Sequence, residues 1–214
     1  MQNTIKQTIQ TIIGDEITNL APLSGGMISE VVKVSFKQNP PLVAKLSQDS
    51  HDLSIEGYML DYLKIHSDLP IPNVLHADKQ LLLIDYIDST TGLSKVTQAE
   101  LGQLIGHLHQ VTANQYGLER DTLIGPLHQP NPQSDSWIEF FRIQRLLYMA
   151  DIALKSGNLP KLTYERLLKL AEKLDHYLVE PSVPALIHGD MWSSNVLTNN
   201  NHVVASSTRQ YIML

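Results

Sequence analysis

Towards its C-terminal end the chain reads His188-Gly189-Asp190-Met191-Trp192-Ser193-Ser194-Asn195, and this segment carries the sharpest sequence signal. An apolar run typical of a buried strand, Pro184-Ala185-Leu186-Ile187, leads into it. One interpretation is structural, in which Asp190 and Asn195 are turn residues that cap local backbone groups. The other is chemical, because a carboxylate and a side-chain amide at this separation are two groups that phosphoryl transfer uses.

The spacing Asp-x-x-x-x-Asn is that of kinase catalytic loops. In such loops the carboxylate accepts the proton of the attacking hydroxyl, and the amide oxygen helps to hold Mg²⁺. We therefore predict that Asp190 is a catalytic base and Asn195 a metal ligand, with His188 bracing the loop through hydrogen bonds. The spacing by itself leaves the structural interpretation open. The order of the upstream segments favours the chemical one.

A lysine and a glutamate precede this loop in the order that a nucleotide site requires. Lys45 ends the apolar strand Leu42-Val43-Ala44-Lys45, which is similar to the Val-Ala-Ile-Lys pattern whose lysine binds phosphates. Glu56 follows on a helix predicted from about Asp52 to Lys64, and it is the natural ion-pair partner of Lys45. Taken alone, each would be an ordinary surface charge.

Two more segments fit the same order. A turn-rich loop over residues 24–30 precedes the first predicted strand, where a phosphate-covering loop would lie. Its candidate contacts are Gly25, Gly26 and Ser29. The loop lacks Gly-x-Gly-x-x-Gly, and a tight hairpin turn explains it equally well. Asp85, Tyr86 and Ile87 follow the buried-strand run Leu81-Leu82-Leu83-Ile84, and their backbone amides could bind an adenine edge. The alternative is an ordinary linker.

The pattern of apolar residues changes near residue 88. Strand-like segments at 31–36, 42–46 and 81–84 come before it, together with the helix that carries Glu56. We therefore predict an α+β, two-lobed protein-kinase-like fold. Its N-lobe over residues 1–87 would be a small antiparallel sheet with helices, and its C-lobe over residues 88–214 mostly helical. A cleft between two such lobes is a common ligand site.

The predicted C-lobe has three helical segments and one long loop. Thr97 and Glu100 indicate a capping box at the start of the first helix. The next helix is expected over residues 137–155, and the polar stretch 112–135 is predicted to be an extended loop. A further helix over residues 163–178 is expected to point four apolar side chains inward: Leu167, Leu170, Ala171 and Leu174.

The composition excludes several classes of function. The 214 residues carry a net charge of −6 without a basic stripe, so a nucleic-acid partner is not expected. The absence of cysteine excludes disulfides, thiol catalysis and thiolate metal sites. No apolar run approaches the roughly 20 residues of a membrane helix, and no secretory signal pattern is visible. We therefore expect no membrane association and a cytoplasmic location. The sequence indicates no particular oligomeric state.

Two hydrolase classes are disfavoured by spacing. His107 and His109 are two residues apart on a predicted helix, so they cannot share one face as metal ligands. The sequence contains neither His-Glu-x-x-His nor Gly-x-Ser-x-Gly.

Several motifs together resemble the fructosamine kinase (ketosamine 3-kinase) family, a branch of the aminoglycoside-phosphotransferase and protein-kinase-like superfamily. The loop 188–195 resembles the family's His-Gly-Asp-Leu-Trp-Ser-Gly-Asn, in which the tryptophan is distinctive. Gly25 to Glu30, Glu56-Gly57, and the helix Leu101 to His109 are similar to further family motifs. Similarity to the family's central segment is found at Tyr116 to Leu118, at Gly125 to Asn131, and at Trp137 with Phe140-Phe141 and Arg145-Leu146.

The resemblance implies ATP-dependent phosphorylation of a sugar hydroxyl on a ketosamine, such as a ribulosamine or fructosamine on a free amine or a protein lysine. ATP and Mg²⁺ would be the cofactors. Residues 85–87 would contact adenine and Lys45 the phosphates. His188, Trp192 and the central segment would border the sugar site, although Trp192 could equally be a packing residue. Another small-molecule kinase, of the aminoglycoside or choline type, and a non-catalytic nucleotide-binding remnant are the alternatives.

One departure from the family pattern affects the expected activity. The family supplies a second acidic Mg²⁺ ligand in Asp-Pro-Ala, after a strand that matches His202-Val203-Val204. Here the sequence continues from Ala205 to Leu214, and no Asp or Glu follows Asp190. We therefore expect an incomplete C-lobe, as after a frameshift, a truncation or an artificial tail. Kinase activity is expected to be weak or absent.

Overall fold

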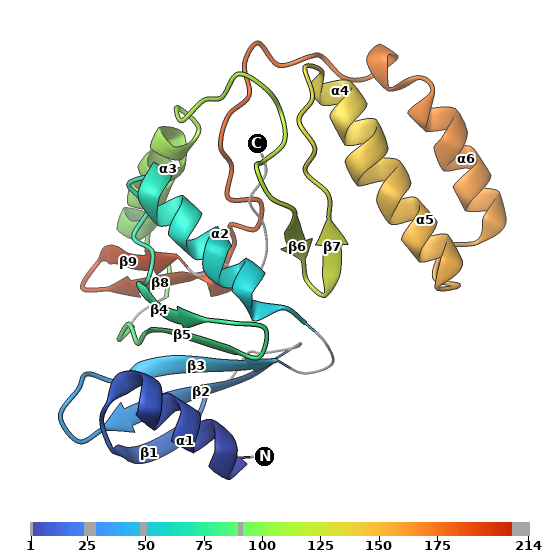
Figure 1. Cartoon of the computed structure of the whole chain (residues 1–214). Helices are drawn as coiled ribbons and strands as arrows, with labels where there is room; N and C mark the ends of the chain where they lie inside the picture. Colours follow the sequence, from blue (N-terminus) through green and yellow to red (C-terminus); the bar gives the residue numbers. More distant parts are fainter. Residues whose placement is uncertain (1, 24–28, 48–50, 90–91, 207–214) are drawn as a thin grey trace.

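The structure is a computed structural model that describes residues 2–23, 29–47, 51–89 and 92–206. An antiparallel sheet of five strands forms one part, and mostly helical structure forms the rest (Figure 1). The sheet part consists of α1 (Gln2–Ile13), β1 (Ile17–Pro22), β2 (Ser29–Phe36), β3 (Leu42–Ser47), α2 (Leu53–His66), β4 (Val74–Ala77) and β5 (Leu81–Asp85). The predicted α+β class is confirmed.

The remaining elements follow β5. They are α3 (Lys95–Leu108), β6 (Thr122–Ile124), β7 (Leu127–Gln129), α4 (Trp137–Phe140), a π-helix (Phe141–Leu147), α5 (Tyr148–Lys155), α6 (Lys161–Ala171), two 3₁₀ turns (Leu174–His176 and Ser193–Asn195), β8 (Val196–Asn199) and β9 (His202–Ser206). The division of the chain at residue 87 stays a prediction.

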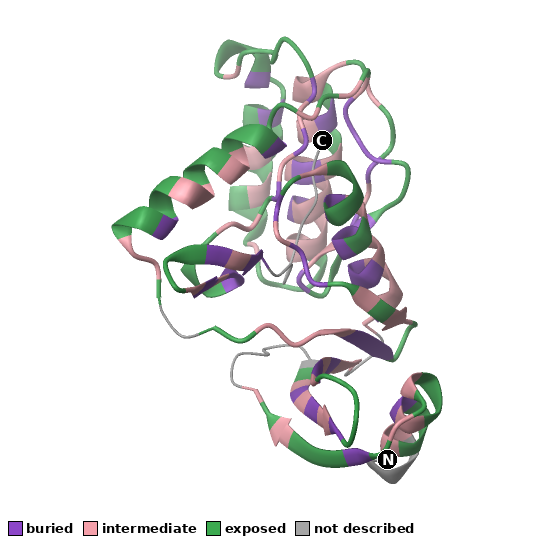
Figure 2. Cartoon of the chain, turned by 90° about the vertical axis from the view of Figure 1, so that its left-hand side faces the viewer, coloured by how far each residue is buried: buried purple, intermediate pink, exposed green. Residues whose placement is uncertain are grey.

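The two faces of the sheet pack against different helices. Its strand order is β1-β2-β3-β5-β4. Since side chains alternate along a strand, Leu81 and Leu83 of β5 join a core cluster with Ile9 of α1, whereas Leu82 joins a cluster with α2. Figure 2 shows the resulting alternation of burial along the strands. The α2 face is therefore the one on which Lys45 lies, because Lys45 pairs with Leu82 in register.

The α2 cluster extends into the helical part of the chain. It combines Leu60 and Leu63 of α2 with Leu108 of α3, Leu118 and Leu186, all of them buried. Leu186 also donates its backbone N–H to Val111 O at 2.8 Å. The segment that leads into the loop 188–195 is thus fixed by the same core that seats α2.

The first helix after the sheet begins earlier than predicted. Ser94 is the N-cap of α3, and its side chain accepts from the Thr97 N–H while Thr97 reciprocates. The predicted pairing of Thr97 with Glu100 is therefore wrong. The Glu100 carboxylate instead accepts from the Val203 N–H at 2.9 Å, which ties α3 to β9.

Two other expectations for the helical part are corrected. The predicted loop 112–135 contains the hairpin of β6 and β7, and the predicted continuous helix 137–155 contains a π-helical segment. In α6, Leu170 is 40% exposed rather than inward, while Ala171 is buried. Figure 1 shows α6 at the outer edge, beside α5. None of the described helices is long and apolar enough to cross a membrane.

Candidate functional site

The lysine and the glutamate predicted to pair form a largely buried ion pair. Lys45 Nζ contacts Glu56 Oε1, and the two side chains are 15% and 9% exposed. Glu56 reaches Lys45 because α2 begins after Asp52, whose carboxylate caps it by accepting from the Ser54 N–H at 3.0 Å. A charge pair with so little access to water is held in one arrangement, since either partner alone would be a buried, uncompensated charge.

This ion pair lies in a cavity of about 310 Å³. Such a volume lies at the small end of the range for ligand pockets. The cavity is lined by Leu23, Val31, Val43, Lys45, Glu56, Leu60, Pro72, Ile84, Asp85, Tyr86, Ile87, Ser89, Ser194 and Leu197. Segments far apart in the sequence therefore meet here: the sheet, α2, the residues after β5, and the end of the predicted catalytic loop.

Several lining residues were missed by the motif comparison. Val43 lies two residues before Lys45 on β3, and Val31 pairs with Lys45 in register, so all three side chains share one face of the sheet. Strand alternation could have identified them as the apolar lining next to the lysine. Pro72, Ser89 and other lining residues far from the motifs carry no comparable signal in the sequence.

The linker after β5 lines the cavity with all three predicted residues. Two of its backbone N–H groups are engaged within the chain: Asp85 donates to Asn73 O at 3.1 Å and Tyr86 to Pro41 O at 3.3 Å. Among the described residues, no hydrogen bond of the Ile87 N–H is found. Of the three amides, that of Ile87 is thus available to a ligand.

The predicted catalytic residues lie side by side. Asn195 is fully buried, and its Nδ2 donates to the backbone oxygen of Asp190 at 2.8 Å and to Asp190 Oδ2 at 2.6 Å. Asn195 Oδ1 is buried and has no hydrogen-bond partner among the described residues. Gly189 allows the sharp turn before Asp190 because its φ of 81° lies in the left-handed region.

His188 lies beneath the loop and is 3% exposed. Its Nδ1 accepts from the Asp190 N–H at 3.3 Å, and its Nε2 is 3.1 Å from Ser206 Oγ. Burial lowers the pKa of His188 to about 4, so the ring is neutral at pH 7. With Nδ1 as an acceptor, the proton is on Nε2 and is donated to Ser206. His188 therefore braces the loop from inside and does not face a substrate.

The remaining residues predicted to contact a ligand are Trp192, Gly25, Gly26 and Ser29. Trp192 is 54% exposed, so it is not a core packing residue. Gly25 and Gly26 lie outside the described residues. Ser29 begins β2 and pairs with Ser47 in register. Within the described residues, no group of three or more His, Cys, Asp and Glu side chains is arranged to hold a metal ion.

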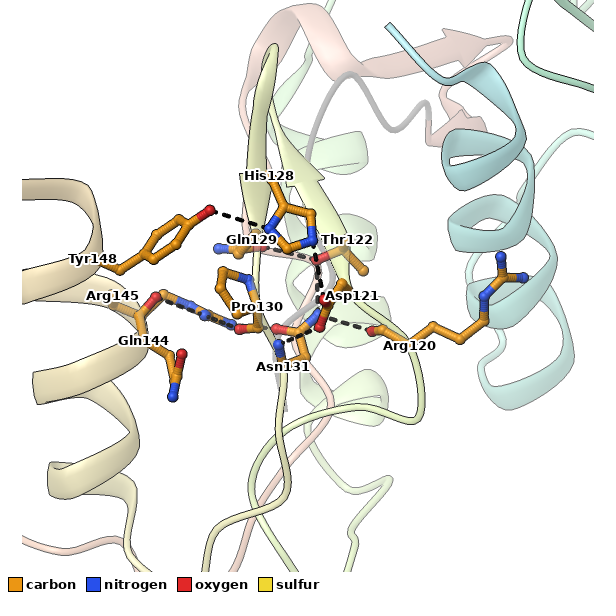
Figure 3. A network of polar contacts seen from close by, with 10 residues as sticks. All are labelled: Arg120, Asp121, Thr122, His128, Gln129, Pro130, Asn131, Gln144, Arg145 and Tyr148. Carbon is orange, nitrogen blue, oxygen red and sulfur yellow. Dashed lines mark hydrogen bonds and ion pairs between the residues drawn. The ribbon is translucent and has the colours of Figure 1, made fainter. Parts of the chain in front are cut away.

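A buried polar network joins the β6–β7 hairpin to the π-helix (Figure 3). Arg145 donates through Nη1 to Pro130 O at 2.7 Å and through Nη2 to Asn131 Oδ1 at 2.5 Å. Asn131 Nδ2 donates to Thr122 Oγ1 at 2.9 Å, and Thr122 donates to Gln129 Oε1 at 3.0 Å. The network holds the central segment in a fixed shape, which polarity alone did not predict.

An exposed chain of contacts runs beside this network. His128 lies between Asp121, whose Oδ2 is 3.0 Å from its Nε2, and Tyr148, whose hydroxyl is 3.1 Å from its Nδ1. In Figure 3 this chain and the contacts of Arg145 both connect the hairpin with the helical segment that carries Arg145 and Tyr148.

Comparison with known proteins gives a consistent assignment. The sequence profile of the family described as fructosamine kinase matches residues 1–207. A protein named probable ketoamine kinase from Synechocystis is 28% identical over 220 residues, covering 97% of this chain and 72% of that protein. The chloroplastic protein-ribulosamine 3-kinase of Arabidopsis thaliana is 31% identical over 127 residues, covering 56% of this chain and 37% of that protein.

Solved structures show the same fold. A Thermobifida fusca protein assigned as a fructosamine-3-kinase has a TM-score of 0.81 and 25% identity, with 96% of this chain and 73% of that chain covered. An aminoglycoside phosphotransferase solved with AMP-PNP and hygromycin B has a TM-score of 0.67 and 15% identity, with 98% and 72% covered. The second likeness shows the fold alone.

Proposed function

The chain belongs to the fructosamine kinase family, and on that premise we propose that it phosphorylates a sugar hydroxyl of ketosamines, ribulosamines or fructosamines, with ATP as the phosphoryl donor. The observation that carries the proposal is the shared cavity. Lys45, Glu56, the linker 85–87 and Ser194 of the catalytic loop line one space, although they are spread over 150 positions of the sequence. A nucleotide site with an adjacent transfer site needs these groups together.

In the proposed arrangement, the linker and the apolar residues Val31 and Val43 receive adenine, and Lys45 contacts the phosphates. Glu56 fixes the position of the Lys45 ammonium group. Gly25 and Gly26 would belong to the loop that covers the phosphates, and Ser29, the first residue of β2, would lie at its end. Asp190 would accept the proton of the attacking sugar hydroxyl, and Trp192, which is exposed next to it, would border the sugar.

The residues present fit a magnesium ion in part. Asn195 offers a buried amide oxygen without a hydrogen-bond partner among the described residues, and hard oxygen donors suit Mg²⁺. The ion would neutralise negative charge on the transferred phosphate. A second carboxylate is missing between Met191 and Leu214. We therefore propose that the polypeptide of residues 1–214 on its own has low turnover.

The test is a coupled assay of ADP release with ATP, Mg²⁺ and a panel of ribulosamine, fructosamine, an aminoglycoside and choline. ADP release with the ketosamines that is abolished by Asp190→Asn supports the proposal. Preference for the aminoglycoside or choline would assign the chain to another class of small-molecule kinase. Turnover near that of a family member with both acidic ligands would contradict the proposed low activity.

A nucleotide-binding remnant is the second candidate, because the candidate nucleotide cavity is present whereas the second carboxylate is not. It predicts that ATP raises the melting temperature equally with and without Mg²⁺ and that no ADP is released. We also propose a cytoplasmic location. Subcellular fractionation tests it.

A further inference from the structure

Asp85 lines the cavity, but its side chain forms hydrogen bonds to a neighbouring loop. Asp85 Oδ2 accepts from the backbone N–H of Asn73 at 3.1 Å and from Asn73 Nδ2 at 2.5 Å. In return, the Asp85 N–H donates to Asn73 O. Three hydrogen bonds thus join the first linker residue to the loop between α2 and β4.

The remaining polar atom of the Asn73 side chain continues the connection. Asn73 Oδ1 accepts from Lys64 Nζ at 2.5 Å, and Lys64 also donates to Ile71 O at 3.1 Å. The side chains therefore form a directed chain from a cation through an amide to a carboxylate. Hydrogen bonds with an ionised partner are the stronger kind, and bonds in such a chain polarise one another.

The two ends of this hydrogen-bonded chain lie on two elements that contribute to the cavity lining, α2 and the linker after β5. Lys64 is in the last turn of α2, the helix that carries Glu56. Asp85 opens the linker whose next residues, Tyr86 and Ile87, line the cavity. The linker is also held from the sheet, since Lys33 Nζ lies 3.5 Å from the centre of the Tyr86 ring.

We propose that Lys64 and Asn73 are positioning residues for nucleotide binding, which act through Asp85 to fix the linker relative to α2. The inference rests on the proposed function in that the ligand is ATP. The physical reason is preorganisation: a linker already held in its binding geometry does not have to be ordered when the nucleotide binds. Lys64 and Asn73 do not line the cavity, and Asp85 lines it in the linker, so substitutions of these residues should affect ATP affinity more than the chemical step.

The experiment measures hydrogen exchange over residues 82–89 and equilibrium ATP affinity for the full chain. Asn73→Ala and Asp85→Ala should both speed hydrogen exchange in the linker and weaken ATP binding about tenfold, the lower end of what the loss of hydrogen bonds to a charged group gives. Asp85→Asn should restore most of the affinity, because its amide oxygen can still accept both bonds from Asn73. Asp68→Ala, at an exposed position just after α2, is the matched control and should behave as wild type.

Unchanged hydrogen exchange over residues 82–89 in Asn73→Ala would overturn the proposal. Faster hydrogen exchange with unchanged ATP affinity would overturn it as well. If the wild-type chain binds no ATP, the proposed function fails first. The exchange measurement then decides separately whether the linker is held by Asn73.

A double-mutant cycle tests whether Lys64 acts on Asp85 through Asn73. Lys64 and Asp85 share Asn73 as their partner, so Lys64→Met and Asp85→Ala should be non-additive in their effect on ATP affinity. This coupling should vanish in an Asn73→Ala background. Additive effects in the presence of Asn73 would refute transmission from Lys64 to Asp85.

Discussion

At the residue scale, the candidate nucleotide cavity depends on the ion pair of Lys45 and Glu56. Glu56→Gln should destabilise the chain by about 3 kcal/mol, because it leaves a buried ammonium group without its carboxylate. ATP affinity should fall with it. Urea unfolding and ATP titration measure the two effects. The double variant Lys45→Met/Glu56→Leu should regain much of the stability but not the ATP affinity. Retained ATP binding in that variant would refute the role of Lys45.

His188 gives a second expectation at this scale, a pH dependence of folding. Its pKa is lowered by burial from 6.5 to about 4, so the unfolded chain binds the proton more readily than the folded chain between these values. Stability is therefore complete above pH 6.5 and falls as the pH drops towards 4, by on the order of 3 kcal/mol.

The measurement is urea unfolding at several pH values between 7 and 4.5, compared with His188→Asn. The asparagine oxygen can replace Nδ1 as acceptor for the Asp190 N–H but does not titrate. The variant should show the shallower pH dependence. Equal slopes in the two proteins would mean that His188 is not the group responsible.

At the element scale, the approach of α2 to β4 depends on Gly57. A Cβ at this position would lie 2.4 Å from the Cβ of Ala77. Gly57→Ala should therefore cost about 2 kcal/mol and displace the neighbouring Glu56, although alanine is normally the better helix former. Gly102→Ala in α3, where the added Cβ meets nothing within 4 Å, is the control and should stabilise by roughly 0.5–1 kcal/mol. If thermal unfolding showed that Gly57→Ala and Gly102→Ala change the stability in the same direction, this expectation would be wrong.

The hairpin of β6 and β7 depends on Arg145 in the π-helix. Arg145→Met should destabilise by about 3 kcal/mol, because Pro130 O and Asn131 Oδ1 lose their donor in a buried site. Faster hydrogen exchange should be concentrated in residues 118–131. Arg166→Met on the exposed surface of α6 serves as control and should stay within about 0.5 kcal/mol. Unaltered exchange in the hairpin would show that other contacts hold it.

At the scale of the whole molecule, the sheet and the helical part share one core cluster. Leu186 is fully buried in it with residues of α2 and α3. Leu186→Ala should cost about 3 kcal/mol and speed hydrogen exchange in β5 and in α3 alike, because Leu82 of β5 and Leu108 of α3 belong to the cluster in which the shorter side chain would leave a void. Leu162→Ala, at a position that is 70% exposed, should have little effect. Exchange that changes in α3 but not in β5 would indicate two independently folding parts.

Local sequence patterns predicted well those elements around the site that depend on neighbouring residues in the chain. The apolar strand that ends at Lys45, the helix predicted from about Asp52 to Lys64 and the apolar run before Asp85 each correspond to an observed element. Prediction failed where contacts between residues far apart in the sequence determine the local structure. Glu100 was assigned to a local capping box, but the Val203 N–H binds it instead. The stretch 112–135 looks like a loop because Thr122, Gln129 and Asn131 are polar, yet they are buried and satisfied by one another and by Arg145.

The α+β class, the order of Lys45, Glu56 and Asp190, and the spacing of Asp190 and Asn195 can be read without a structure, because they follow from short-range periodicity and motif spacing. Three features become visible only in the folded chain: Lys45 and Glu56 share a cavity with the linker and Ser194, His188 is buried and neutral, and Asp85 is hydrogen-bonded to Asn73. Such relations depend on which segments the core brings into contact, and burial and pairing are properties of that packing rather than of any single segment.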